Sequence, residues 1–217
     1  MSKKLLYGVG TNDSWYTLSK REKLTEILPC GQSKSRVIWK CPYYTKWESM
    51  LRRCYSKYAH QSHPTYVGCT VCKEWLTFSN FREWMVYQDW EGMTLDKDFL
   101  GQNCMVYSPE TCVFILNRVN CFIEDRGLDR GNYLLGCDVS RDNNGRFRAR
   151  CSDPLSRKDS SYLGYYGTEL AAHLVWKRQK HEYACELADS EYVTDDRVRE
   201  VLINRYKNYT ILEDHLK

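Results

Sequence analysis

The chain has 217 residues with a formal net charge of +4, a mean hydropathy of −0.64 and 14% aromatic residues. This length suits one large or two small domains, and the aromatic content argues against intrinsic disorder. No apolar run approaches the ~20 residues of a membrane span, and the N-terminus lacks the apolar stretch of a signal peptide, so we expect a cytoplasmic protein without a membrane partner.

Residues 1–38 are mixed and polar. Lys4–Gly10 reads as a short strand and Ser19–Leu28 as a short helix. Pro29, Gly31 and the serines that follow are typical of a linker. We therefore expect an N-terminal segment that ends in a linker.

Residues 39–128 form a tryptophan-rich block with two predicted helices. In 44–56, the apolar residues recur at i, i+3, i+4 and i+7, which predicts an amphipathic helix. Arg52 and Arg53 lie on its other face and are candidate contacts to a nucleic-acid backbone. A second helix is predicted over 74–88, followed by short strands at 94–99 and 112–115 and a short helix at 117–125. The apolar residues of the two helices are Trp47, Met50, Leu51 and Cys54, then Phe78, Phe81 and Met85.

A three-stranded antiparallel meander is predicted next, over 134–140, 145–151 and 162–166, with an Asn-Gly turn. In its middle strand, Arg146, Arg148 and Arg150 alternate with apolar residues, so the three arginines should share one face. We expect these guanidinium groups to project together without acidic partners, as a polyanion or the base edges of a groove would require. The alternative is a half-buried strand with ordinary solvated arginines.

A long helix with Thr168 as N-cap and Glu169 in its first turn follows the meander and should bury the apolar face of the sheet. Its predicted buried stripe is Ala172, Trp176, Tyr183, Ala184 and Leu187. A last helix is predicted from about residue 194, with Val198, Val201, Leu202 and Tyr209 on one side.

The meander and its helix resemble the AP2 DNA-binding domain, on Gly136, the run 147–149, the run 163–168 and the pair 171–172. The resemblance implies that the sheet lies in the major groove of double-stranded DNA. Arg146, Arg148 and Arg150 would then read bases or bind phosphates, with Arg141 and Lys158 near the edges.

The upstream block resembles phage-encoded HNH-type proteins, on segments 47–55, 64–66, 71–75, 95–98 and 107–120. Together the two resemblances imply an α+β protein of homing-endonuclease type in the cytoplasm of a host cell. The expected parts are an N-terminal segment (1–38), an HNH-like ββα lobe with flanking helices (39–128), an AP2-like three-stranded antiparallel sheet packed on one helix (129–189) and a C-terminal helix (190–217).

An HNH site needs a general base, usually His, and a divalent cation such as Mg²⁺ or Mn²⁺. Where the related nucleases carry Asp-His, this chain has Asp96-Lys97, and Asn120 matches the family's Asn on the following helix. Asp98 would put a second carboxylate on the same strand face for the metal. Lys97 could contact phosphate but is a poor base unless its pKa is strongly lowered. The alternative is a solvated strand end.

Cys69 and Cys72 have zinc-knuckle spacing but no second such pair. Either Cys54, Cys112 or a loop histidine completes a zinc site, or the thiols are buried in a core. The eleven cysteines are otherwise expected to be reduced.

The leading function is therefore metal-dependent cleavage or nicking of double-stranded DNA, with the AP2-like sheet choosing the target. The absence of the histidine leaves a second interpretation, a catalytically inactive, regulatory DNA-binding protein. A third is a protein-interaction module that does not bind nucleic acid.

Overall fold

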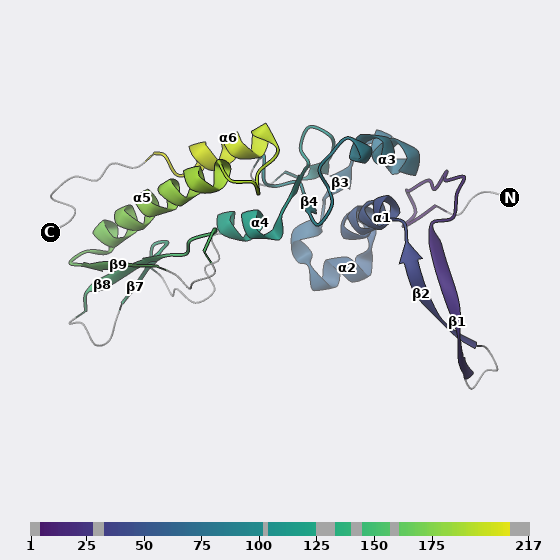
Figure 1. The fold of residues 1–217 in the computed structure, drawn as a ribbon, viewed down its shortest axis with the longest axis horizontal. Helices are drawn as coiled ribbons and strands as arrows, with labels where there is room; N and C mark the ends of the chain where they lie inside the picture. Colours follow the sequence, from purple (N-terminus) through teal and green to yellow (C-terminus); the bar gives the residue numbers. More distant parts are fainter. Residues whose placement is uncertain are drawn as a thin grey trace. The chain divides into compact units, whose positions relative to one another are not determined.

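The computed structural model describes residues 5–27, 33–101, 104–124, 133–139, 145–156 and 161–208 and shows an α+β protein (Figure 1). The chain divides into two compact units, Met1–Trp90 with Leu95–Cys112 (unit 1) and Glu91–Thr94 with Val113–Lys217 (unit 2). Within the described ranges, no helix is long and apolar enough to cross a bilayer. The predicted sites Arg141 and Lys158, Asn144 of the predicted Asn-Gly turn and Tyr209 lie outside those ranges.

The core of unit 1 is built by helices α1 (Pro42–Tyr55), α2 (Lys57–Ser62) and α3 (Phe78–Val86), with single 3-10 turns at Pro64–Tyr66 and Glu74–Leu76. The buried residues of α1 and α3 are those that the helical periodicity predicted. The indole of Trp47 donates a hydrogen bond to the Trp75 carbonyl at 2.7 Å, so even the polar atom of this ring has a partner in the core.

Unit 1 also contains two small sheets. Strands β1 (Ser19–Ile27) and β2 (Ser33–Lys40) pair antiparallel, and β3 (Thr70–Val71) pairs parallel with β5 (Val106–Tyr107). The short helix predicted over 19–28 is therefore wrong, and the serines of the predicted linker, Ser33 and Ser35, belong to β2; Pro29 and Gly31 lie outside the described residues. Pairing between the two segments overrides the weak helical preference of the Lys, Arg and Glu residues. Of the short strand predicted before residue 10, only a bridge between Leu6 and Gly10 is formed.

In unit 2, the antiparallel sheet β7 (Cys137–Val139), β8 (Phe147–Cys151) and β9 (Ser161–Tyr166) packs along α5 (Glu169–Ala188), as Figure 1 shows. Ala149 and Cys137 are buried against Ala172 of this helix. The Thr168 hydroxyl accepts a hydrogen bond from the Ala171 N–H at 3.2 Å, so the predicted N-cap is confirmed. The predicted meander and its packing helix are confirmed with it.

Gly136 begins this sheet with φ +76°, and a Cβ at that position would lie 1.9 Å from Cγ of Trp176 on α5. Any side chain would both strain the backbone and collide with the indole. This residue is therefore a fixed point of contact between the sheet and the helix.

Helices α4 (Asn117–Ile123) and α6 (Asp196–Arg205) complete unit 2, with the short strands β4 (Thr94–Asp96) and β6 (Val113–Ile115) at the division between the units. The Lys180 ammonium of α5 donates to the Phe122 carbonyl at 2.5 Å, and Arg205 of α6 donates to the Ile123 carbonyl at 3.3 Å. Because these bonds hold the end of α4, the helix belongs to the same unit as the β7–β9 sheet. The predicted boundary at residue 128 instead placed it in the preceding domain.

Candidate nucleic-acid interface

The face of the β7–β9 sheet opposite α5 carries the predicted arginines. Asp138, Arg148 and Tyr165 occupy one cross-strand row, and Arg150 is paired with Tyr162 in the next. Cross-strand partners lie on the same face of a sheet, whereas the intervening Ala149 is fully buried on the other. We call Asp138, Arg148, Arg150, Tyr162 and Tyr165 the arginine face. Its two tyrosine rings are 5.4 Å apart, and Tyr162 is exposed.

Asp138 links the two arginines of this face. Its carboxylate accepts hydrogen bonds from Nε and Nη2 of Arg148 at 2.7 and 3.0 Å, and from Nη2 of Arg150 at 2.5 Å. These bonds hold the pKa of the Asp138 carboxyl below its ordinary value, with the Arg148 bond as the largest cause. The expectation of arginines without acidic partners, as a polyanion or a groove would require, is therefore wrong, and this pairing counts against the face as a duplex-binding surface. The two arginines do project together, because one carboxylate binds both.

This arrangement lowers the net charge of the face and fixes the direction of its guanidinium groups. A guanidinium has five N–H donors, and Asp138 accepts two from Arg148 and one from Arg150, so donors remain for a second acceptor. Partly exposed ion pairs of this kind contribute little stability, and a phosphate or a base edge can compete for the same donors. The face can thus bind an anionic or acceptor-rich ligand with oriented, weakly held arginines.

The other predicted contacts divide into two groups. Arg146 precedes β8 and is exposed, as is Arg52 on α1. Arg53 is half-buried instead. Its Nη1 lies 3.4 Å from the Leu95 carbonyl in β4 and 3.5 Å from the Tyr107 hydroxyl in β5, and these contacts link α1 to both strands. Arg53 is therefore a structural residue, and its predicted place on the free face of the helix is wrong.

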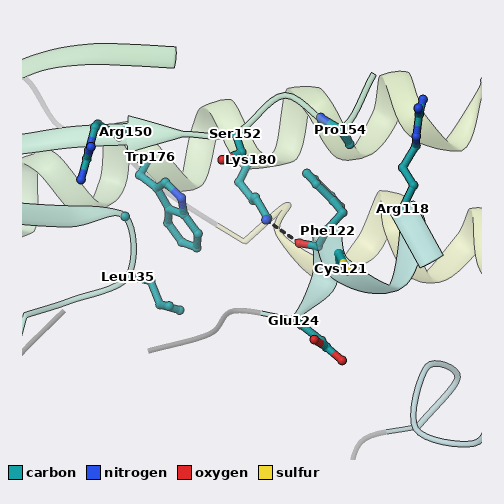
Figure 2. Close-up of a pocket in the computed structure, with 11 residues that line it drawn as sticks. Arg118, Cys121, Phe122, Glu124, Leu135, Arg150, Ser152, Pro154, Trp176 and Lys180 are labelled. Atoms are coloured by element: carbon teal, nitrogen blue, oxygen red, sulfur yellow. Dashed lines mark hydrogen bonds between the residues drawn. The ribbon is translucent and has the colours of Figure 1, made fainter. Parts of the chain in front are cut away.

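A pocket of about 500 Å³ lies within unit 2 where α4, α5 and the end of β8 meet. Figure 2 shows Lys180 reaching from α5 to the end of α4, with the Phe122 ring beside it and Trp176 on the same helix. Lys180 is buried, and its ammonium lies 3.9 Å from the centroid of the Phe122 ring. Arg150 lines this pocket as well as the arginine face, so one residue connects the two surfaces.

Sequence reasoning missed Asp138, the two tyrosines and Lys180. Asp138 follows the same alternation as Arg148, one position from buried Cys137, and could have been found by that signal. Lys180 stands four residues from both Trp176 and Ala184, so its place in the buried stripe was readable from the spacing. A charged residue in an apolar stripe indicates a buried partner, here the Phe122 carbonyl.

The segment 96–98, which carries the predicted catalytic and metal-binding residues, is not a continuous strand. Strand β4 ends at Asp96 because its Oδ1 accepts the N–H groups of Asp98 and Phe99, both at 2.8 Å. Burial is the main cause that raises the pKa of Asp96. Asp98 lies beyond the strand, and its two oxygens each lie 2.7 Å from Nζ of Lys97. The predicted pair of carboxylates on one strand face is therefore wrong.

Lys97 is only 5% exposed. Burial alone would lower its pKa, but the hydrogen bonds and charge of Asp98 more than offset this, so the pKa is raised. The condition under which Lys97 could act as a base is not met. Its ammonium stays charged at neutral pH and neutralises Asp98.

The remaining predicted ligands are distributed over both units of the chain. Asn120 of α4 donates to Glu124 at 3.3 Å and belongs to unit 2, whereas Asp96 belongs to unit 1. In the loop that precedes β3, the Cys69 thiol lies 3.9 Å from the Thr65 carbonyl. Burial raises the pKa of Cys69 and of Cys72, which disfavours the thiolate that binds zinc.

Two further observations concern metals and relatives. Within the described part of the chain, no three His, Cys, Asp or Glu side chains lie close enough together to hold a metal ion, and all ten of its cysteines are free thiols. The arginine face is the candidate site with the best-defined geometry, because Asp138 orients both Arg148 and Arg150. No protein-family model, curated protein or solved structure matches this chain.

Proposed function

We propose that this protein binds double-stranded DNA through the arginine face of an AP2-like sheet. The observation that carries the proposal is the joint orientation of Arg148 and Arg150 by Asp138, on a sheet whose opposite face is buried against α5. A sheet braced by a helix presents its side chains in a fixed pattern. Such a pattern is what recognition of base edges in the major groove requires.

The chemistry of the face suits DNA better than a small anion. Guanidinium groups bind both phosphate oxygens and the O6 and N7 atoms of guanine, and they can do so in a bidentate manner. The exposed ring of Tyr162 beside them offers contact with sugar or base. Asp138 keeps the arginines extended before the ligand arrives, which reduces the ordering cost of binding.

Lys97 favours DNA binding without cleavage. Lys97 is buried and bound to Asp98, and the resemblance to HNH-type proteins implies that a general base would be needed at this position. Cleavage by an HNH-like site is the second candidate, and the observation in its favour is the half-buried Asp96 with its raised pKa, since carboxyls of this kind occur in catalytic sites. A divalent cation, Mg²⁺ or Mn²⁺, would have to draw Asp98 away from Lys97.

Binding is tested by fluorescence anisotropy with a labelled pool of random duplexes. The Arg148→Gln and Arg150→Gln variants should bind more weakly than the wild type, by roughly 1–3 kcal/mol each if the arginine contacts a base. Arg199→Gln is the matched control, because Arg199 is also a partly exposed arginine of unit 2 paired with an aspartate, Asp189. Equal affinities for all three variants and the wild type would contradict the proposal.

Cleavage is tested on supercoiled plasmid with Mg²⁺, with Mn²⁺ and with a chelator. Metal-dependent nicking that Asp96→Ala abolishes would establish the nuclease. Retention of plasmid without nicking would leave the binding function alone. If plasmid is not retained even at low salt, the protein-interaction module becomes the best account.

A further inference from the structure

The β1–β2 ribbon is the most exposed part of the described chain. All of its described side chains, at 19–23 and 34–40, are exposed on both faces, and Figure 1 shows the two strands extending away from α1. Isolated two-stranded ribbons are marginally stable in water because they have no buried face. A ribbon of this kind gains its stability from whatever binds it.

The ribbon concentrates the positive charge of the protein. Residues 19–40 contain six Lys or Arg and two Asp or Glu, a net charge of +4. The whole chain contains 32 and 28, so the rest has 26 of each and no net charge. The formal charge that makes this protein basic therefore equals the charge of this one hairpin.

The two faces of the ribbon carry cations in different ways. Arg21 and Lys23 alternate on one face, opposite Val37 and Ser35. Arg36 lies on the other face opposite Glu22, with which it forms an ion pair at 2.9 Å, and a register shift between Lys20 and Arg21 interrupts the alternation next to Lys20. No salt bridge joins Lys20, Arg21 or Lys23 to a carboxylate among the residues that the structure describes.

Exposed apolar side chains accompany these charges. Val37, Ile38 and Trp39 are 49%, 56% and 42% exposed, although such residues usually lie in a core. Cations and apolar groups that are exposed together indicate a partner with both negative charge and apolar surface. A DNA groove has phosphates on its walls and base edges, including thymine methyl groups, on its floor.

We propose that the β1–β2 ribbon is a second DNA-binding element that enters the major groove of a duplex. The major groove is about 12 Å wide and admits a two-stranded ribbon, and its two walls would meet the cations on both faces at once. A membrane surface would contact only one face. A second copy of the ribbon would bring like charges together, so neither partner suits the distribution as well.

The test uses the double variant Arg21→Gln/Lys23→Gln in the full chain. Removing two phosphate contacts should reduce the slope of log affinity against log salt by about two and weaken binding roughly 10- to 100-fold at about 0.1 M salt. The control is Lys73→Gln/Arg199→Gln, which removes one exposed and one partly exposed charge outside the ribbon and should change the slope little. Circular dichroism of both variants checks that the fold is retained.

The inference is overturned if the ribbon variant keeps the slope of the wild type, or if the control loses as much as the ribbon variant. It is also overturned if the ribbon variant loses binding to phosphatidylserine vesicles, or loses self-association, while its DNA slope is unchanged. The arginine face is scored separately. If Arg148→Gln leaves DNA binding unchanged and the ribbon variant weakens it, the proposed function is contradicted and the ribbon inference stands. If Arg148→Gln weakens DNA binding and the ribbon variant does not, only the ribbon inference is contradicted.

Discussion

The two basic sheets of this protein are built differently. The β7–β9 sheet is buried on one side by α5, and its two central arginines are bound by Asp138. Every described side chain of the β1–β2 ribbon, at 19–23 and 34–40, is exposed, and three of its cations lack a carboxylate partner among the described residues. The comparison indicates that a braced sheet can hold guanidinium groups in a defined geometry, whereas an unsupported ribbon supplies charge and reach. We therefore expect the β7–β9 sheet to supply sequence preference for DNA and the β1–β2 ribbon to supply salt-dependent affinity.

The largest expected effect tests whether α5 braces the β7–β9 sheet. Gly136→Ala places a Cβ against the Trp176 ring and keeps φ at +76°, so we expect a loss of about 3 kcal/mol or more in the free energy of unfolding. Gly145→Ala is the control, since its φ of +72° is similar but a Cβ there meets nothing within 4 Å. Urea unfolding measures both. Equal losses would show that contact between helix and sheet contributes nothing at Gly136.

The second prediction separates geometry from charge. Arg148→Gln should cost roughly 1–3 kcal/mol of DNA affinity and relax the base preference at one position of the bound site. Arg21→Gln should instead weaken binding to all sequences equally and reduce the salt slope by about one. Selection from a random duplex library, followed by titration at several salt concentrations, measures both effects. A change in base preference caused by Arg21→Gln would contradict the expectation that the ribbon binds all sequences equally.

A third, smaller effect is the pH dependence of stability. The folded-state pKa values of Asp96 and Asp138 are shifted in opposite directions. The folded-state pKa of Asp138 is lowered, so the stability it contributes is present above its unfolded pKa and is lost as pH falls through the folded value. The folded-state pKa of Asp96 is raised, so its contribution is full when it is protonated and is lost as pH rises through that value.

Hydrogen exchange measured by mass spectrometry can follow these two regions separately. Below pH of about 4, the β7–β9 sheet should lose protection, and Asp138→Asn should remove that part of the pH dependence. The segment around Asp96 should gain protection on acidification, and Asp96→Asn should abolish the gain. The same direction of change in both segments would contradict this assignment of causes.

The smallest expected effect concerns the ribbon alone. Ile38→Thr replaces an apolar side chain that is already more than half exposed, so the free energy of unfolding should change by no more than about 0.5 kcal/mol. If the ribbon binds DNA, the same change should still weaken binding, since it removes apolar contact area. A large loss of stability would mean that the ribbon is packed in the folded protein and is not a free arm.

Periodicity predicted the cores well. The apolar stripes at Trp47 and Phe78, the meander and the Thr168 cap all follow from local patterns, because each depends on residues within one element. The β1–β2 ribbon could not be found in this way. The residues of β1 favour a helix locally, and only the pairing of 19–27 with 33–40 makes them a strand.

The candidate site was predictable in part. Alternation placed Arg148 and Arg150 on one face, but the carboxylate between them comes from another strand, ten and twelve residues away. Likewise, Asp96 and Asp98 have the spacing of a strand pair, yet the hydrogen bonds of Asp96 to the next two N–H groups end the strand. Contacts between elements, and the caps that end them, are what a pattern of residue types does not contain.

Lys180 has a practical consequence for dividing the chain. A fragment that begins at residue 129, where the sequence suggests a domain, would lack the Phe122 carbonyl. The buried ammonium of Lys180 would then have lost this hydrogen-bond acceptor in an apolar environment. A fragment that begins at residue 113 keeps the carbonyl and the aromatic ring that surround this charge. Expression of the C-terminal half should therefore succeed from the earlier start, and the later one should yield an aggregation-prone product.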